Sequence, residues 1–500
     1  MGEISYPGVY PEGHDSELIS AEDLERQAAQ RWAELPRIMG RADSINEVWE
    51  ATMQEVAAGW LEGPINAPEM GEGAVPVRRF AVWQKGKLRC CDNFKRSRVN
   101  EATLVKSPIA LPSVDHLVAI ADAVRAGHPV AFFKADHEAA LKQLPLKDDH
   151  AKYAVVAVLC PETGQPRYFR SKTLMFGATS SVVHYNAVSR AVASLAARVL
   201  GIPIIGYFDD FAGAVQRGLE QEALQLFCWL NRALGFLIKD SKCDSGEEIE
   251  FLGIQLSADG TGPVSVSMSD ERGDGLLKAI STALESGSLR PPDAAVLAGK
   301  LGFAQYYIFG RFGRAFLPRL YAHAAGSECH LSAGLRGDLE WWEDYIRSAP
   351  SRLMRRPPSK PTHVIYTDAN GLGGLGAVVI RPGGRRRTFH GSAPPSMWPR
   401  LASTSAIYAL EVLAVLRILR RIEAELAGAT VRIFVDNDAA TISLVAGRSR
   451  AAVVNEMVRE AWLILARKGA SAWLERVDTK SNPADEPSRA SEMASGWVRF

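Results

Sequence analysis

Three aspartates near the middle of the chain could carry phosphoryl-transfer chemistry. Asp136 ends the apolar run PVAFFKAD, and Asp209 and Asp210 are adjacent in GYFDDF, between two apolar runs. Two Mg²⁺ ions about 3.5–4 Å apart can activate an attacking oxygen and stabilise a leaving group, and Mg²⁺ prefers carboxylate oxygens. Adjacent acids also repel each other unless a cation neutralises them. Taken alone, however, the Asp-Asp pair could be a polar turn and Asp136 the N-cap of a helix.

Four further acids follow in the C-terminal third of the chain. They are Asp368 at the end of HVIYTD, Glu411 in the helical pattern STSAIYALEVLAVLRIL, Asp436 at the end of TVRIFVD, and Asp485 in SNPADEPSR. Singly, Glu411 could lie on a solvated helix face and Asp485 could be an ordinary helix cap. In this order, the four acids and the motifs TDA, VDN and NPADEPSR resemble those of retroelement ribonucleases H (RNases H), which cut RNA with two metal ions.

Strand and helix patterns must position the first three aspartates. VRRFAVWQKGKLRCCD predicts a hairpin turning at Lys85-Gly86, and KYAVVAVLC with PRYFRSKTL predicts a second hairpin around PETGQ. A helix is predicted at about 180–200, followed by a strand, a tight acidic turn and a strand in IPIIGYFDDFAGAV. The segment from about Glu22 to Trp60 has helical periodicity. EGPINAPEMGEGAVP after it reads as a linker or loop, because Gly and Pro interrupt regular structure.

The C-terminal part has a different order of elements. From about Asp270 to Ser348 the pattern is mostly helical, and SAPSRLMRRPPSKP then reads as a linker. After it come three strand patterns, a long helix at Ser405–Ala427, a strand, two helices and a final strand. This mixed α/β order predicts a separate compact unit.

Five motifs in the first part resemble, in order and spacing, those of retroelement reverse transcriptases. They are RCCDNFKRSRVN, FFKADHEAALKQLPL, LMFGATSSVVHYNAVSRA, GYFDDF and LGFLIKDSKCDSGEEIEFLGIQL. The resemblance is closest to DIRS-like tyrosine-recombinase retrotransposons, with the gypsy and pararetrovirus groups next. It implies an α+β right-hand polymerase of fingers, palm and thumb, followed by a mixed α/β RNase H-like domain.

The resemblance predicts five segments along the chain. They are an N-terminal helical extension and linker at 1–75, reverse transcriptase fingers and palm at 76–262, a helical thumb or connection at 263–347, a Pro/Arg-rich linker at 348–361 and the RNase H-like domain at 362–500. We find no internal repeat in the sequence.

The resemblance also implies which residues hold metal ions. Each active site should bind two Mg²⁺ or Mn²⁺ ions. The ligands would be Asp136, Asp209 and Asp210 in the polymerase, and Asp368, Glu411, Asp436 and Asp485 in the nuclease. These seven carboxylates are the predicted catalytic residues.

Four residues are predicted to line the nucleotide site by the same resemblance: Arg89, Leu141, Gly177 and Lys242. Arg89 would lie over the triphosphate, where a guanidinium can donate to two phosphate oxygens, or it could be a solvated hairpin arginine. Gly177 would allow close backbone approach to the base pair, or it could be a plain turn glycine. Lys242 would support the triphosphate side, or it could be a surface lysine.

Leu141 is the main departure from the family pattern. The residue at this position is typically aromatic, and a bulky side chain under the sugar can refuse a 2′-hydroxyl sterically. A leucine reaches less far, so we expect looser exclusion of ribonucleotides; alternatively, Leu141 packs in the palm core and Phe176 shapes the sugar pocket. Asn93 replaces a second acid found in many relatives, and residues 479–482 contain no histidine like the one many RNases H carry before the last acid.

A basic and aromatic segment precedes the linker. In LAGKLGFAQYYIFGRFGRAFLPRLY, aromatic residues alternate with four cations, Lys300, Arg311, Arg314 and Arg319. Such cations can contact nucleic-acid phosphates while the rings pack inward. Alternatively, the rings are core and the cations are merely solvated. Arg355 and Arg356 in the linker could also contact a hybrid.

Composition adds few constraints. The chain has 500 residues and a formal net charge of only +1, so any phosphate-binding surface must be local. Its six cysteines form no CxxC pair and no zinc pattern. The sequence shows no signal peptide and no apolar run long enough to span a membrane, so we expect an intracellular protein, cytoplasmic or nuclear.

The sequence therefore predicts an RNA-directed DNA polymerase that also copies DNA templates and cuts the RNA of RNA–DNA hybrids. Its expected partners are an RNA template, a DNA primer, the hybrid, dNTPs and other retroelement proteins, with no membrane. The alternative is a domesticated or decayed retroelement protein that binds nucleic acid without polymerising, and Leu141 and Asn93 keep it open. An RNA-templated RNA polymerase fits less well, because an RNase H domain is useful where a hybrid is made.

Overall fold

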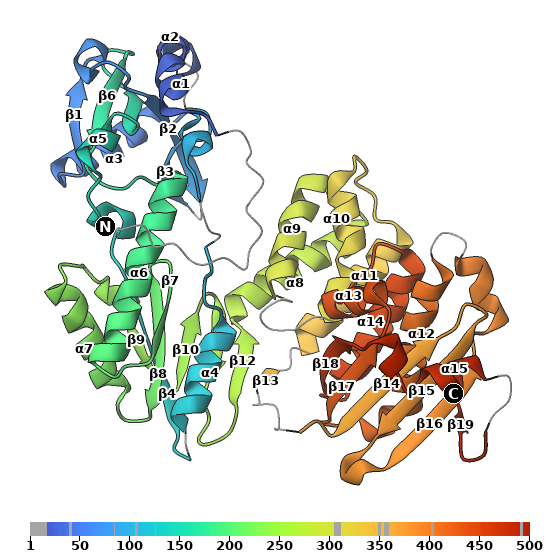
Figure 1. Ribbon diagram of the computed structural model, residues 1–500. Helices are drawn as coiled ribbons and strands as arrows, with labels where there is room; N and C mark the ends of the chain where they lie inside the picture. The colour runs from blue at the N-terminus through green and yellow to red at the C-terminus, as the bar shows by residue number, and fades with distance from the viewer. Residues whose placement is uncertain are drawn as a thin grey trace. The chain divides into compact units, whose positions relative to one another are not determined.

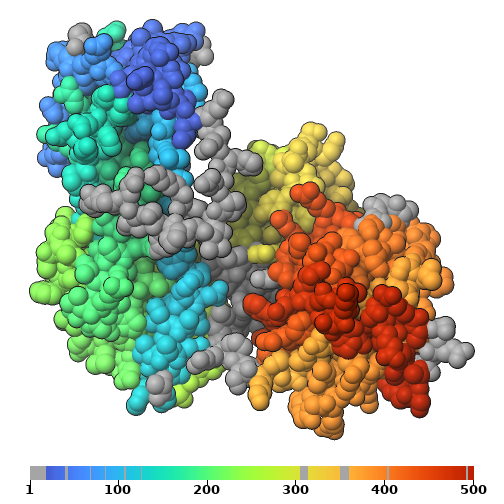
Figure 2. Space-filling model, in the orientation of Figure 1, coloured from blue at the N-terminus to red at the C-terminus, as the bar shows by residue number. Residues whose placement is uncertain are grey.

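The computed structural model describes residues 18–39, 43–84, 86–105, 109–125, 127–304, 312–348, 352–354, 360–401, 405–490 and 494–500. The chain forms two compact units, Met1–Ile249 and Glu250–Phe500. Figure 1 shows the elements of both units, and Figure 2 shows one face of their surfaces. Each unit is described by itself.

The first unit contains a five-stranded sheet in the order β1-β6-β5-β2-β3. Its strands are β1 (Leu61–Ile65), β2 (Pro76–Gln84), β3 (Lys87–Asp92), β5 (Val155–Leu159) and β6 (Pro166–Ser171). Both predicted hairpins are confirmed, because β2 pairs with β3 and β5 with β6 in antiparallel register. The sequence predicts a loop after Trp60, whereas the structure has β1 there. This strand pairs only with β6, at the sheet edge, where a proline such as Pro64 is tolerated.

The N-terminal segment forms three helices, α1 (Ala21–Arg26), α2 (Ala28–Met39) and α3 (Ile45–Ala57), of which α2 and α3 pack against this sheet. Successive side chains of a strand point to opposite faces of the sheet. On β5, Val155 packs in one cluster with Met39 of α2, whereas Val156 packs in another with Val48 of α3. The two helices therefore cover opposite faces, and the helical pattern predicted before Trp60 is confirmed.

A four-stranded sheet in the order β7-β8-β4-β9 completes the first unit. Its strands are β4 (Val130–Asp136), β7 (Ile204–Tyr207), β8 (Asp210–Gln216) and β9 (Asp244–Gly246), and the helices that pack on it are α4 (Val114–Arg125), α6 (Thr179–Val199) and α7 (Glu220–Ala233). Phe133 of β4 packs with Val192 of α6 and Phe227 of α7. Because β4 is apolar and almost wholly buried, its end is a rigid place from which to project Asp136.

The second unit begins with a sheet and a group of helices. The sheet has the order β10-β11-β12-β13, with β10 (Glu248–Phe251), β11 (Ile254–Ser257), β12 (Val264–Met268) and β13 (Arg352–Met354). The helices are α8 (Asp270–Ser286), α9 (Pro291–Ala304), α10 (Pro318–Ala325) and α11 (Ala333–Ser348). The predicted helical stretch is confirmed. The predicted linker at 348–361, however, contributes β13, which pairs with β12.

The C-terminal sheet has six strands in the order β18-β17-β14-β15-β16-β19. Its strands are β14 (His363–Ala369), β15 (Gly374–Ile380), β16 (Arg386–Ser392), β17 (Thr430–Val435), β18 (Ser471–Arg476) and β19 (Val498–Arg499). β14, β15 and β16 are antiparallel neighbours, whereas β17 runs parallel to both β14 and β18. Four helices accompany this sheet: α12 (Ala406–Arg421), α13 (Asp438–Ala446), α14 (Ala452–Arg467) and α15 (Asp485–Arg489). The predicted order of elements is confirmed as far as β18, but the predicted final strand is followed by α15 and β19.

Helix α12 lies at the centre of this C-terminal part. Its residues from Ala409 to Leu416 are all buried, because it packs against β14 on one side and α14 on another. A helix that is apolar on nearly every side belongs in a core. Glu411 is the one acid in this buried run, and its placement therefore needs a separate explanation.

Among the helices that the structure describes, none combines the length and the apolar character needed to cross a membrane. All six cysteines lie in the described ranges, and all are free thiols.

Candidate active sites

The first acidic site, Asp136, Asp209 and Asp210, forms where two strands of the β7-β8-β4-β9 sheet meet a tight turn. Asp136 ends β4 and lies directly opposite Asp210, the first residue of β8. Asp209 lies in the turn between β7 and β8. The turn is strained, because Phe208 has a φ of +52°, and Ser189 Oγ supports it by donating to the Phe208 carbonyl at 2.7 Å.

Gly206, just before this turn, has to be glycine. A Cβ atom there would lie 2.6 Å from Ser189 Oγ and 2.9 Å from the Phe211 ring. Absence of a side chain lets α6 approach β7 closely enough for Ser189 to reach the turn. The motif GYFDDF thus combines a close approach, a strained turn and two acids in consecutive positions.

The first acidic site contains more negative than positive charge. Burial raises the pKa of Asp209, and it raises the pKa of Asp210 to about 7 together with a hydrogen bond to Asp136 and repulsion from both other acids. Among the described residues, Lys242 pairs with this site: its Nζ donates to Asp136 Oδ2 at 2.5 Å. Three acids beside one lysine leave a deficit of positive charge, so the site fits a cation.

A buried histidine, His137, is hydrogen-bonded to the turn of the first acidic site. His137 is 1% exposed, and its backbone N–H donates to the Asp209 carbonyl at 3.0 Å. Its Nε2 lies 2.7 Å from Asn231 Oδ1, and its Nδ1 lies 2.7 Å from the Tyr185 hydroxyl. Because Asn231 Nδ2 donates to the Phe227 carbonyl, Oδ1 is left to accept from Nε2–H, and Nδ1 accepts from Tyr185.

This arrangement requires a neutral imidazole, which agrees with the lowering of the pKa of His137 by burial. It joins the end of β4 to α6 through Tyr185 and to α7 through Asn231. Sequence reasoning missed all three residues. The one available signal was a histidine directly after a strand-end acid.

The predicted nucleotide residues lie in different environments. Arg89 is exposed on β3. Leu141 is buried in a cluster with Leu174 and Tyr185, as in the alternative in which it packs in the core, while Phe176 is exposed. Lys242 pairs with Asp136, as described above.

Gly177 has a structural reason to be glycine. Its φ is +88°, and a Cβ atom there would lie 2.5 Å from the carbonyl oxygen of Asp92. The Gly177 carbonyl also accepts a hydrogen bond from Asn100 Nδ2 at 2.9 Å, and Asn100 Oδ1 accepts from the Thr179 N–H. The loop before α6 is therefore fixed against the segment after β3, two motifs that are far apart in the sequence.

The second acidic site, Asp368, Glu411 and Asp436, brings together two neighbouring parallel strands and a helix. Asp368 lies near the end of β14, Asp436 directly follows β17, and Glu411 projects from α12. One ligand oxygen of each lies within 4.8 Å of the others, so the three residues could hold a metal ion. In the described part of the chain, this is the one group of acids, histidines or cysteines that meets this spacing.

Electrostatics at the second acidic site also fit a cation. Burial, with repulsion from Asp436, raises the pKa of Glu411 to about 9 and that of Asp368 to about 7. Glu411 Oε1 accepts from the Ala369 N–H at 3.3 Å, whereas Oε2 is buried with no hydrogen-bond partner among the described residues. A buried unpaired carboxylate oxygen is costly, and a divalent cation with oxygen ligands would satisfy it.

The last predicted acid, Asp485, begins α15 beside this group but is not one of its three members. Its carboxylate pairs with Arg489 at 2.7 Å, while Ser488 Oγ of the same helix donates to Asp368 Oδ2. Asn482, another residue missed from the sequence, is buried and donates to the Thr367 carbonyl at 2.9 Å. It occupies the stretch in which a histidine was absent.

The predicted phosphate-binding cations are only partly available. Lys300 is exposed on α9, and Arg311 lies outside the described residues. Arg314 donates to the Ala446 carbonyl at 3.3 Å. Arg319 donates to the Asp338 carboxylate at 2.9 Å. The latter two thus make contacts within the second unit.

Asp338 and Phe316 join the connecting helices to α14. Asp338 is 2% exposed and pairs with Arg459 of α14 as well as with Arg319. The Arg459 guanidinium also lies 4.6 Å above the Phe316 ring, which stacks on Trp341. Phe316 is therefore a core ring, as in the alternative reading of the basic and aromatic segment.

Comparison with known proteins gives a fold but no family. No protein-family model and no curated protein matches the chain. Among solved structures, the foamy virus protease–reverse transcriptase in complex with double-stranded DNA is 13% identical, with 88% of this chain and 84% of that chain covered and a TM-score of 0.50. The dRH form of that enzyme with double-stranded DNA is also 13% identical, covering 84% and 68%, with a TM-score of 0.48. This chain thus has a mixed α/β fold like that of a solved reverse transcriptase.

Proposed function

We propose that this chain is a DNA polymerase, directed by RNA and by DNA, that also cuts the RNA strand of RNA–DNA hybrids. The observation that carries the proposal is the first acidic site: Asp136 opposite Asp210, with Asp209 in the strained turn beside them. The second acidic site supports the nuclease activity. The likeness in fold to a reverse transcriptase structure supports the polymerase part of the proposal.

In this proposal, the first unit supplies fingers and palm. Strands β2, β3, β5 and β6 form the fingers, with β1, α2 and α3 of the N-terminal extension packed against them, and the β7-β8-β4-β9 sheet is the palm. Helices α8 to α11 are the thumb and connection, and the six-stranded C-terminal sheet with α12 to α15 is the RNase H domain. We keep the predicted domain limits at 76–262, 263–347 and 362–500 as part of the proposal, with 1–75 and 348–361 as the extension and linker.

The polymerase residues have distinct tasks. Asp136, Asp209 and Asp210 would hold two Mg²⁺ or Mn²⁺ ions, which supply activation of the primer hydroxyl and charge stabilisation. Lys242, displaced from Asp136, would be free to face the dNTP phosphates, and Arg89 would reach them from β3. Gly177 and Leu141 would shape the floor beneath the base pair and sugar. His137 keeps the end of β4 and the acidic turn in register.

The nuclease residues are Asp368, Glu411 and Asp436, with Asp485 as a fourth, more exposed acid. Their charge deficit and the unpaired Glu411 oxygen would be relieved by metal binding. Partners of the whole chain would be an RNA template, a DNA primer, their hybrid and dNTPs; the DNA bound in the foamy virus structure supports a duplex partner. Of the four predicted cations, the exposed Lys300 would be the one to meet a phosphate.

Primer extension by the purified full-length chain tests this proposal. A labelled DNA primer is annealed to RNA and DNA templates of the same sequence, and dNTPs are added with Mg²⁺ or Mn²⁺. We expect extension on both templates, and none when the metal is chelated. Binding of both duplexes without any extension would contradict the proposal and would favour the non-polymerising alternative.

A further inference from the structure

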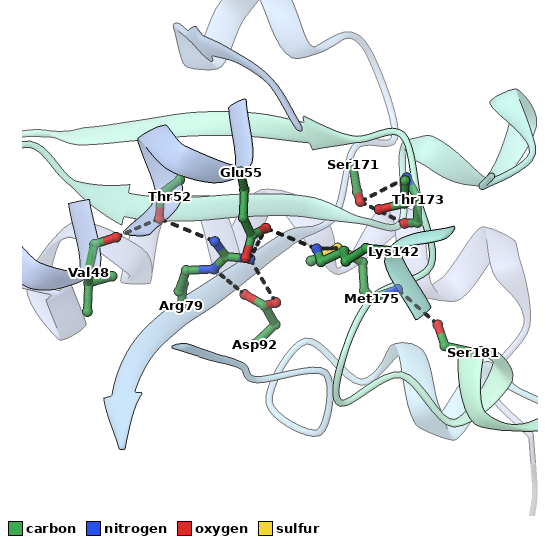
Figure 3. Close-up of polar contacts among 10 residues, drawn as sticks. All are labelled: Val48, Thr52, Glu55, Arg79, Asp92, Lys142, Ser171, Thr173, Met175 and Ser181. Carbon is green, nitrogen blue, oxygen red and sulfur yellow. Dashed lines mark hydrogen bonds and ion pairs between the residues drawn. The ribbon is translucent and has the colours of Figure 1, made fainter. Parts of the chain in front are cut away.

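Four charged side chains from four separate segments meet inside the fingers part of the first unit (Figure 3). We call Arg79, Asp92, Glu55 and Lys142 the buried charge cluster. Arg79 of β2 donates to both oxygens of Asp92, at 2.9 and 3.1 Å, and to Glu55 Oε2 at 3.1 Å. Lys142 Nζ donates to the same Glu55 oxygen at 2.9 Å.

The buried charge cluster is electrically balanced only when all four members are present. The side chains of Arg79, Asp92 and Lys142 are at most 3% exposed, and that of Glu55 is 18% exposed. Burial alone would raise the pKa of Glu55, but Arg79 and Lys142 outweigh it and lower that pKa, so Glu55 is ionised. Two cations and two anions then compensate one another in a largely buried region, in which Glu55 alone of the four is partly exposed.

Glu55 is the member that joins the two halves of the cluster. It comes from α3, in the N-terminal segment for which the sequence suggested no role, and Figure 3 shows its carboxylate between the Arg79 guanidinium and the Lys142 ammonium. Thr52, one turn earlier on α3, accepts from Arg79 Nη1 at 3.3 Å. Without Glu55, Lys142 would keep no anionic partner in the cluster.

Two of the other members, Lys142 and Asp92, adjoin residues of the proposed nucleotide site. Lys142 directly follows Leu141 in the short helix Ala140–Gln143 and lies 3.7 Å from the sulfur of Met175, two residues before Gly177. The carbonyl of Asp92 is the atom that excludes a side chain at Gly177. Asp92 also ends β3, three residues after Arg89.

From these contacts we infer that Glu55 is a positioning residue for the dNTP site. By balancing Arg79 and Lys142, it holds β3, the segment of Leu141 and the loop of Gly177 in one arrangement. The inference rests on the proposed polymerase function, and it assigns the N-terminal helix α3 a part in nucleotide binding. Glu55 itself touches neither substrate nor metal in this account.

The test is the Glu55→Gln variant of the full-length chain, assayed with saturating primer–template and varied dNTP. Gln keeps the shape and removes the charge, which leaves Lys142 buried without an anion. We expect KM for dNTP to rise roughly tenfold or more, with kcat changed less than about threefold, because removing one partner of a buried ion pair is strongly disruptive locally. Cleavage of a preformed hybrid should stay at the wild-type rate.

Two further variants separate positioning from general damage. Glu50→Gln removes an exposed charge from the same helix and should leave KM unchanged. Glu55→Gln combined with Lys142→Met removes one charge of each sign and should recover most of the wild-type KM. If Glu55→Gln does not fold, Glu55→Asp, which keeps the charge at shorter reach, is assayed by the same criterion.

Hydrogen exchange separates this inference from the proposed function. If the wild-type chain extends no primer, the proposed function fails, but exchange at residues 140–143 and 175–177 still reports whether Glu55 holds them. We expect faster exchange there in Glu55→Gln than in Glu50→Gln. Unchanged KM and exchange, or a KM defect that the double variant does not relieve, would overturn the inference.

Discussion

At the scale of single residues, the first acidic site depends on a neutral layer of three buried, uncharged side chains packed against it and on a lysine paired with Asp136. His137, Tyr185 and Asn231 form the neutral layer, and hydrogen bonds join both ring nitrogens of His137 to the other two side chains. Lys242 is the cation, and its side chain is half exposed while Asp136 is 5% exposed. A lysine so placed can leave Asp136 when another cation arrives, whereas the buried layer cannot move without cost.

Replacing Tyr185 with phenylalanine tests the neutral layer. The hydroxyl is the partner of His137 Nδ1, so Tyr185→Phe leaves a buried acceptor unpaired, which typically costs about 1–3 kcal/mol. We expect that loss in the free energy of unfolding of the first unit, measured by urea denaturation, together with slower primer extension. Tyr168→Phe, at another buried tyrosine of the same unit, is the control; an equal effect of both substitutions would contradict a special role for the layer.

Enlarging Leu141 tests what this residue does for sugar choice. Leu141 is already packed against Leu174 and Tyr185, and inserting a larger side chain into a packed site costs about 1–3 kcal/mol. We therefore expect Leu141→Phe to lower stability by that amount and to change the ratio of kcat/KM for a dNTP over its rNTP less than about tenfold. A larger increase of that ratio would instead show that Leu141 lies directly under the sugar and gates it.

At the scale of elements, close backbone approaches position the acids. Strand β15, which follows the glycine-rich turn after Asp368, contains two glycines that meet α15. A Cβ atom at Gly374 would collide with the Ser488 carbonyl, and one at Gly376 would lie 2.6 Å from the Ser488 N–H nitrogen. Through Ser488, this packing also supplies the hydrogen bond to Asp368.

Gly376→Ala should therefore displace α15. We expect loss of most hybrid cleavage and a lower melting temperature of the second unit, while primer extension on a short template stays near the wild-type rate. Gly371→Ala is the matched control, because a Cβ atom there meets nothing within 4 Å. Full cleavage by Gly376→Ala would show that α15 does not support the second acidic site.

The attachment of α3 should depend on pH in a defined direction. Because the pKa of Glu55 is lowered from 4.5 on folding, its contribution to stability is complete above about pH 4.5 and is lost as pH falls through the lower folded pKa. We expect Glu55→Gln to cost about 3 kcal/mol at pH 7, the scale for breaking a buried pair, and progressively less below pH 4.5. Urea unfolding of both proteins across pH 3.5–7 measures this, and a difference that grows as pH falls would contradict it.

Local patterns in the sequence predict these elements well, and long-range contacts explain what they miss. Both hairpins, the helical stretches and the order around α12 follow from apolar periodicity and turn residues. The sequence does not predict β1 or β13. Gly and Pro in β1, and the Pro/Arg-rich sequence around β13, are typical of loops. These segments are strands because β1 pairs with β6 and β13 pairs with β12. The partners of Glu55 lie 24 to 87 residues away, beyond any local pattern.

For the acidic sites too, the sequence predicts the residues but not their long-range contacts. Motif order identified Asp368, Glu411 and Asp436, and the structure brings them together. Motif order could not show that Arg319 is paired with the buried Asp338, because that contact depends on how α10, α11 and α14 pack. Nor could it show the pairing of Lys242 with Asp136, which depends on the short segment between α7 and β9.

At the scale of the whole molecule, the chain places two acidic sites in two separate compact units. Each site has carboxylates whose pKa values are raised by desolvation, and each site is built on its own sheet. We therefore expect two active sites that can be inactivated one at a time.

One assay tests this claim most directly. A DNA primer is annealed to a labelled RNA template, and both primer extension and RNA cleavage in the hybrid region are followed in the wild type, in Asp209→Asn/Asp210→Asn and in Asp368→Asn/Glu411→Gln. We expect the wild type to do both, the first variant to cleave without extending, and the second to extend without cleaving. Extension by Asp209→Asn/Asp210→Asn near the wild-type rate, or loss of both activities together in a folded variant, would contradict the account.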